Sequence, residues 1–223
     1  MPLAHIAGTD ENIEIRKIFC VGRNYAEHAR EMKAELPEVP VFFLKPATAV
    51  VGDGGITIRP KICKELHHEV EMTVLIGAGG RNISREAAIS HVAGYGVGLD
   101  MTLRDIQGEA KKRGLPWTLS KGFDTSAPIS EFVQATTIPN PHDLEVSLTV
   151  NGTRRQHAST RNLIFQVDYL ISYLSQFFTL ERGDILFTGT PEGVAATVPG
   201  DRLEARLVSP IDGVLAFLRV RIQ

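Results

Sequence analysis

Residues 67–76 read HHEVEMTVLI, an acidic pair set in a run of apolar residues. Apolar side chains recur at every second position from Val70 to Ile76, which is the period of a strand. On a strand, Glu69 and Glu71 share the opposite face, whereas a helix would turn them to nearly opposite sides. The stretch therefore predicts a strand on which two carboxylates stand side by side.

Two carboxylates this close repel each other, and a positive group between them would relieve the repulsion. A second apolar run, residues 95–99, ends at Asp100, at a strand-to-helix corner where functional residues often lie. Asp100 is the natural third ligand, and three oxygen ligands without cysteine favour a hard cation, Mg²⁺ or Mn²⁺. The alternative is an exposed Glu-x-Glu edge paired with lysine or arginine, because glutamate is normally a surface residue.

The composition of the 223 residues argues against several classes of protein. Lys and Arg total 24 and Asp and Glu 26, and no basic stripe or polybasic cluster indicates nucleic acid or a membrane surface. Cys20 and Cys63 form no CxxC pair, which favours a reducing compartment. Residues 1–12 do not resemble a signal peptide, and no apolar run approaches the roughly 18 residues of a membrane span. We therefore expect a soluble, cytoplasmic protein.

The rest of the chain predicts many short strands and few helices. Strands are expected at residues 18–21, 41–44 (buried), 56–58, 144–150, 185–187 and within 203–222, with an Asn151-Gly152 hairpin turn after the fourth. Helices are expected after a cap at Asn24 and before Pro37, at 85–92, at 103–113, and at 163–176 after a cap at Asn162. This order favours an α+β, β-rich roll over a parallel doubly wound sheet.

Further motifs surround the acidic pair in a fixed order. They are GRNY at 22–25, FLKP at 43–46, EVE at 69–71, GLDMT at 98–102 with Arg104 and Gln107 after it, SKGFD at 120–124, GD at 183–184 and TGTPEGV at 188–194. Together they resemble the fumarylacetoacetate hydrolase family, most closely its short branch with acylpyruvases and oxaloacetate decarboxylases. The resemblance runs from about Lys17 to the C-terminus. It implies a mixed β-sandwich roll, with residues 1–16 as a short N-terminal segment and 17–223 as one catalytic domain.

The resemblance also implies catalytic roles. His28 and Glu31, at i and i+3 of the first predicted helix, are similar to the family's dyad on a mobile lid. There the carboxylate orients the ring, raises its pKa, and leaves one nitrogen free to take a proton from water. Lys121 is similar to the family's donor to a developing oxyanion. Without the resemblance, His28 and Glu31 would be read as an ordinary surface ion pair.

Substrate contacts are implied in the same way. The resemblance assigns them to Arg104 and Gln107, which with Lys121 form a clamp, to Thr190, and more weakly to Arg23 and Lys45. The neighbouring Lys111, Lys112 and Arg113 are expected to be solvated. A zinc site at His67 and His68 is rejected, because adjacent strand residues point opposite ways and no Cys completes a tetrahedral set.

We expect a Mg²⁺- or Mn²⁺-dependent enzyme that cleaves a C–C bond in small 2,4-dioxo acids, acylpyruvates such as fumarylpyruvate, to release pyruvate. Three protein ligands leave three octahedral positions, and a 2-oxo acid can fill two of them. The cation would then stabilise the enolate formed on cleavage. Alternatives are oxaloacetate decarboxylation, enol–keto isomerisation of a 2-oxo dicarboxylic acid, and, remotely, a non-catalytic binder of metal or oxo acids. The family resemblance also implies a homodimer.

Overall fold

The computed structural model describes residues 2–31 and 35–223. Two sheets dominate the described chain. The first has six strands in the order β12 (Val133–Gln134), β9 (Val92–Leu99), β8 (Val70–Ile76), β15 (Ile185–Phe187), β3 (Ile18–Gly22) and β4 (Val41–Lys45). The second has five, in the order β14 (Thr153–Ser159), β13 (Glu145–Val150), β17 (Arg202–Ser209), β18 (Gly213–Ile222) and β6 (Ile56–Thr57).

Smaller sheets join the ends of these two. They are β10 (Thr102–Leu103) with β7 (Leu66–His68) and β16 (Ala195–Thr197), β1 (Leu3–His5) with β2 (Asn12–Glu14), and β11 (Ala127–Pro128) with β5 (Val50–Val51). The α-helices are α1 (Ala26–Glu31), α2 (Arg104–Lys112), α3 (Thr118–Lys121) and α4 (Val167–Phe177). Within the described ranges, no helix is long and apolar enough to cross a membrane.

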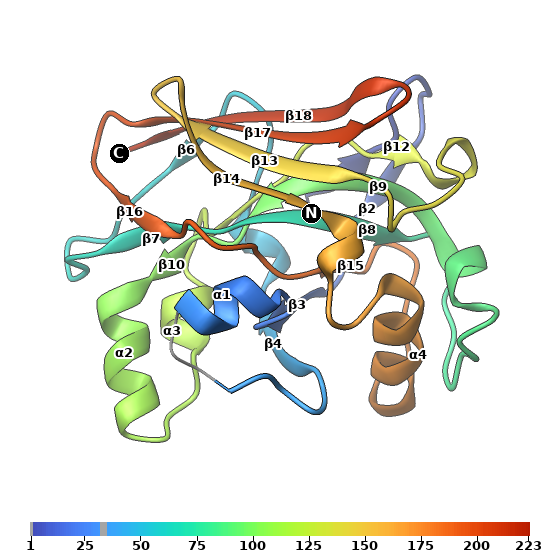
Figure 1. Cartoon of the computed structure of the whole chain (residues 1–223), viewed down its shortest axis with the longest axis horizontal. Coiled ribbons are helices and arrows are strands. Elements are labelled where there is room, and N and C mark those ends of the chain that lie inside the picture. Colours follow the sequence, from blue (N-terminus) through green and yellow to red (C-terminus); the bar gives the residue numbers. More distant parts are fainter. Residues whose placement is uncertain (1, 32–34) are drawn as a thin grey trace.

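The layers follow from the apolar faces of the strands. The five-stranded sheet lies on one side of β8 and β9, and the four helices lie on the other side (Figure 1). The main core fills the space between the sheets and contains Val70, Met72 and Val74 of β8 as well as Leu148 of β13 and Leu207 of β17. The predicted β-rich α+β roll is confirmed. Because every residue of β8 is buried, its polar side chains point into the interior of the protein.

The sequence predicts the strands well and one helix wrongly. The helix expected at residues 85–92 is absent: the chain forms a 3₁₀ turn, Ala88–His91, and then enters β9 at Val92. Pairing of Val92 with Ile76 across the sheet overrides the local helical pattern. The Asn151-Gly152 turn is confirmed, with φ of 51° and 80°, the positive values that a type I′ turn requires.

Two predicted helix caps are also wrong. The fourth helix begins at Val167, because Asn162 ends a 3₁₀ turn and residues 163–166 bend past Asn24 before the helix starts. Asn24 is buried and ties loops together: its side chain accepts from the Phe165 amide at 2.7 Å and donates to the carbonyl of Thr188 at 2.8 Å. α1 is described as far as Glu31, and the predicted continuation toward Pro37 passes through residues 32–34, which lie outside the described residues.

The sequence predicts a buried strand at residues 41–44, and its burial is wrong: in β4 these four residues are half-buried or exposed. β4 is the last strand of the six-stranded sheet, and Leu44 is 46% exposed. A pocket of about 800 Å³ lies along this edge, lined by β4 and by residues 115–118, with none of the three predicted metal ligands in it. Periodicity could not show this, because an apolar run looks the same in a central strand and an edge strand.

Candidate active site

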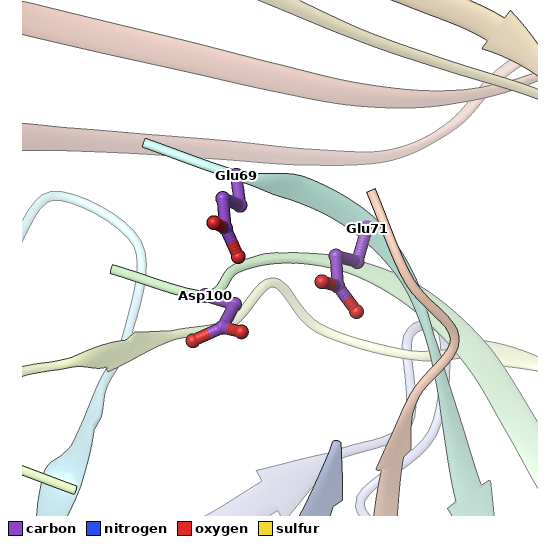
Figure 2. A group of neighbouring side chains, drawn as sticks. All are labelled: Glu69, Glu71 and Asp100. Atoms are coloured by element: carbon purple, nitrogen blue, oxygen red, sulfur yellow. The ribbon is translucent and has the colours of Figure 1, made fainter. Parts of the chain in front are cut away.

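The register of β8 and β9 brings the three acids together. Glu71 pairs with Gly98, and one step further the Asp100 amide donates to the carbonyl of Glu69 at 2.8 Å. Since side chains two residues apart share a face, Glu69, Glu71 and Asp100 all open to the same side. Figure 2 shows their carboxylates pointing into one shared space, and the ligand atoms lie within 4.8 Å of one another. All three residues are buried, so an exposed Glu-x-Glu edge is wrong.

The electrostatics of the group are uneven. Burial raises the pKa of Glu71 well above its usual range, and the negative charges of Asp100 and Glu69 raise it further. Burial also acts to raise the pKa of Glu69, but the cationic Lys121 and Arg104 hold it well below its usual range. Among the described residues Glu71 has no ion pair, and its Oε2 accepts from the Gly189 amide at 2.6 Å. The cationic side chains of the pocket therefore compensate the charge of Glu69 more than that of Glu71.

This donor set fits a divalent cation. Three buried carboxylates offer hard oxygen ligands at a spacing that one ion can bridge, which is the preference of Mg²⁺ and Mn²⁺. The loop that faces Glu71 is shaped for close approach. Gly189 has φ of 99°, and a Cβ there would lie 2.6 Å from the Cβ of Asn24, so any larger residue would move the amide that binds Glu71.

Two cationic residues, Lys121 of α3 and Arg104 of α2, lie beside the three acids. Nζ of Lys121, at the end of α3, donates to Oε2 of Glu69, Oδ2 of Asp100 and Oγ1 of Thr102, each at 2.6 Å. Burial acts to lower the pKa of Lys121, but Asp100 and Glu69 outweigh it and raise the pKa, so the amine is protonated. Arg104, the first residue of α2, forms an ion pair with Glu69.

The predicted dyad reaches the same pocket from α1. Nδ1 of His28 lies 3.4 Å from Oε2 of Glu31, and Glu31 accepts from the Gly193 amide at 3.2 Å. Burial lowers the pKa of His28, although Glu69 and Glu31 act to raise it. Glu31 acts to raise the pKa of His28, as expected, but desolvation is the larger effect, so the net shift of the pKa is downward. A neutral ring at neutral pH suits a general base.

A pocket of about 300 Å³ contains most of the predicted site. Its lining includes the three acids, His28, Lys121, Arg104, Gln107, Thr190 and Arg23. Gln107 accepts from Nη1 of Arg104 at 2.6 Å, so these two predicted clamp residues are joined. Lys45 lies behind this lining: its Nζ is 2.8 Å from Oδ1 of Asp100 and donates to the carbonyl of Ser126 at 3.0 Å.

Sequence reasoning missed Lys111. It lines the pocket, with its Nζ 5.1 Å from the ring centroid of Trp117, which lines the pocket as well. Lys111 is exposed, as expected, but it also borders the pocket, and partial desolvation lowers its pKa. The signal was the helical spacing: Arg104, Gln107 and Lys111 lie at i, i+3 and i+7 and share one face of α2.

The pattern of residues recurs in known proteins. The sequence model described as fumarylacetoacetate (FAA) hydrolase C-terminal matches residues 17–222. The chain belongs to the fumarylacetoacetate hydrolase family. The match spans both large sheets and every residue of the pocket, so the resemblance expected from the ordered motifs is confirmed.

Several known proteins are similar to this chain over most of their length. Oxaloacetate tautomerase FAHD1, mitochondrial, from Rattus norvegicus is 49% identical over 91% of this chain and 90% of the relative. The crystal structure of fumarylpyruvate hydrolase from Pseudomonas aeruginosa, in complex with Mn²⁺ and pyruvate, is 43% identical with a TM-score of 0.92, covering 99% and 95% of the two chains. A 5-carboxymethyl-2-hydroxymuconate delta-isomerase from Mycobacterium smegmatis is 34% identical with a TM-score of 0.82, covering 95% and 80%.

Proposed function

We propose that this protein is a Mg²⁺- or Mn²⁺-dependent enzyme that hydrolyses a C–C bond in small 2,4-dioxo acids, with fumarylpyruvate as the type of substrate. One observation carries the proposal. Three crowded buried carboxylates and a neutral, carboxylate-oriented histidine line the same pocket. The first set suits a divalent cation and the second suits a base that activates water.

Glu69, Glu71 and Asp100 would hold the cation, and its Lewis acidity would polarise the keto oxygen of a bound 2-oxo acid. The P. aeruginosa relative supports this assignment, because that protein is described in complex with Mn²⁺ and pyruvate. Pyruvate is the fragment that hydrolysis of an acylpyruvate would release.

The chain's own residues supply the other parts of the reaction. A carboxylate only accepts, so the contact between Glu31 and Nδ1 of His28 assigns the proton to Nδ1 and leaves Nε2 free. Nε2 takes a proton from water, the water oxygen bonds to the distal carbonyl carbon, and protonated Lys121 stabilises the oxyanion. The C–C bond then breaks, its electrons pass to the pyruvate fragment as an enolate, and the histidine proton returns to that fragment.

The charge of the pocket favours a substrate with two carboxylates. Four cationic side chains line it, namely Arg23, Arg104, Lys111 and Lys121, against the three acids. A divalent cation on the acids would leave a clear excess of positive charge, which a dianion balances better than a monoanion. Arg23 has φ of 59°, an uncommon conformation for a non-glycine residue and one that clusters at functional sites.

A second candidate is keto–enol tautomerisation of oxaloacetate, favoured by the 49% identity to the R. norvegicus relative named for that activity. It needs the base but no attacking water. Purified protein loaded with Mg²⁺ or Mn²⁺ should be assayed with fumarylpyruvate and with the enol form of oxaloacetate. Pyruvate release from fumarylpyruvate supports the first candidate, tautomerisation of oxaloacetate without pyruvate release supports the second, and full turnover after exhaustive chelation contradicts both. Oxaloacetate decarboxylation is detected in the same assay as release of CO₂.

The homodimer implied by the family stays a prediction, and so does the cytoplasmic location. Analytical ultracentrifugation of the whole chain tests the first. The exposed edge strand β4, with Leu44 46% exposed, is a surface that an isologous partner strand could cover.

A further inference from the structure

The buried side-chain amide of Gln156 connects two segments that border the pocket. Gln156 of β14 is 1% exposed, and its side chain reaches between the β7–β8 junction and the loop after β15. Its Oε1 accepts from the Val70 amide at 3.0 Å and lies 3.0 Å from Nδ1 of His68. Its Nε2 donates to Oγ1 of Thr190 and to the carbonyl of Pro191, each at 2.9 Å. All four hydrogen-bonding positions of this side chain are used.

The partners fix which way the amide points. The Pro191 carbonyl can only accept and the Val70 amide can only donate, so nitrogen and oxygen cannot be exchanged. Two consequences follow. His68 must carry its proton on Nδ1 to donate to Oε1, and Thr190 must accept from Nε2. Within the described residues Thr190 Oγ1 has no other hydrogen-bond partner, so its own proton is free to point into the pocket that Thr190 lines.

We propose that Gln156 is a positioning residue that makes the Thr190 hydroxyl a committed donor to a substrate carboxylate. Its other end holds the peptide of Val70, which separates Glu69 from Glu71, so the same side chain sets the spacing between the acids and the carboxylate-binding hydroxyl. A hydroxyl that accepts from an amide is a stronger donor itself, because chained hydrogen bonds polarise one another. This inference rests on the proposed function, in which the substrate is a 2-oxo acid.

The substitution Gln156→Glu separates the two ends of the side chain. It keeps the shape and keeps an oxygen opposite the Val70 amide and His68. At the other end it replaces a donor by an acceptor, so the Thr190 hydroxyl turns to donate to the new carboxylate and is lost to the ligand. Gln176→Glu, at an exposed position on α4, is the matched control for the change in charge.

The experiment measures binding, with turnover as a second readout. Oxalate binding to the Mn²⁺-loaded protein is measured by calorimetry for the wild type, Gln156→Glu, Thr190→Val and the double variant. We expect each single variant to bind on the order of 10-fold more weakly, the value of one lost hydrogen bond to a charged group. The double variant should bind no more weakly than either single, because both remove the same interaction. Mn²⁺ affinity and the Gln176→Glu control should match the wild type, and KM should change more than kcat.

A measurement on the wild type keeps the proposal testable if Gln156→Glu fails to fold. ¹⁵N NMR of labelled histidines should show His68 as the Nδ1–H tautomer, and an Nε2–H tautomer would overturn the assignment. Wild-type oxalate affinity in Gln156→Glu, or a double variant weakened by the product of the two single effects, would also overturn it. Oxalate binding by the wild type without turnover contradicts the proposed function alone. Absence of oxalate binding with Mn²⁺ contradicts both.

Discussion

The three carboxylates and the histidine–glutamate pair share one pocket but are held in different ways. Glu71 stands on β8, inside the six-stranded sheet, and Asp100 directly follows the neighbouring strand β9, so the backbone ladder between these two strands holds both residues in place. His28 and Glu31 stand on the six-residue helix α1, and the contact between them is 3.4 Å long. Glu31 is tied to the rest of the site through the Gly193 amide.

The difference matches the two tasks. A metal site needs ligands fixed at the spacing of the ion, and rigid strands supply that spacing. A general base needs to come within hydrogen-bond reach of water only when substrate is bound, and such contacts are often long in the free enzyme. Substitutions in one of the two regions therefore show whether the other region responds.

The largest effect is expected from Glu71→Gln in the rigid region. We expect activity to fall by more than about 100-fold. Loss of a residue that only hydrogen-bonds to a metal ligand already lowers metal affinity or activity by about 10–100-fold. The metal-free variant should melt at a higher temperature than the wild type. Glu71 has a raised pKa in the folded protein, so its charged form opposes folding above the ordinary carboxyl pKa, and the neutral amide removes that cost.

Thermal denaturation with and without Mn²⁺ checks this prediction. In the wild type, Mn²⁺ at about 100 times its Kd should stabilise by about 2.7 kcal/mol, and Glu71→Gln should lose most of this gain. Glu131→Gln, at an exposed position, is the control, and it should be stabilised by Mn²⁺ as much as the wild type. An unchanged metal response in Glu71→Gln would remove this residue from the metal site.

His28→Ala is expected to have the next largest effect, confined to the dyad. Loss of a general base typically lowers the rate by about 10²–10⁴-fold, while Mn²⁺ affinity should stay at the wild-type value because His28 is not among the three acids. The variant should damage acylpyruvate hydrolysis more than oxaloacetate decarboxylation, which needs no attacking water. Equal loss of both activities would show that His28 serves positioning instead of water activation.

The pH profile gives a smaller and more specific test. His28 must be neutral to act as a base, and burial lowers its pKa below 6.5. The acid limb of kcat/KM should therefore lie below pH 6.5, and Glu31→Gln should move it lower, because Glu31 acts to raise the pKa. The profile is measured with wild type and variant at saturating metal. A limb above pH 6.5 in the wild type would contradict the burial of the ring.

The sequence predicts the metal region better than the rest of the site, for a physical reason. Period-two alternation on β8 and the end of an apolar run at Asp100 are local signals, and the sheet register then brings the acids together. Gln156 carries no such signal. Its importance comes from contacts with Val70 and Thr190, which are 86 and 34 residues away along the chain.

The errors have the same origin. The segment at 85–92 has a helical pattern, but the need of Val92 to pair with Ile76 decides its structure. Lys45 also depends on tertiary partners: the fold turns its amine to Asp100 and Ser126, and its contact with substrate stays a prediction. In both cases a contact with a distant part of the chain determines the local structure, and that contact is not visible in the local sequence.

The smallest expected effect concerns the cationic rim of the pocket. Lys111 lines it beside Trp117, from the same face of α2 as Arg104. If Lys111 meets the second carboxylate of a substrate, Lys111→Met should raise KM for fumarylpyruvate, a dianion, by about two- to fivefold, the value of an ion pair near the surface. The KM for acetylpyruvate, which has no second carboxylate, should not change, and kcat should stay the same for both.

Lys112→Met is the matched control, because Lys112 is the next residue of α2 but its side chain is 73% exposed and pairs with Glu109. The test separates specific contact from general attraction of anions. If Lys111 acted only by general attraction of anions, both variants would have a higher KM for both substrates, and the difference from the wild type would vanish at high salt. If the contact is made by Lys111 alone, Lys111→Met changes only the KM for the dianion, because only the dianion carries the carboxylate to which the amine binds. An equal rise in KM for both substrates in Lys111→Met would contradict the contact and leave the charge of the pocket as a steering effect only.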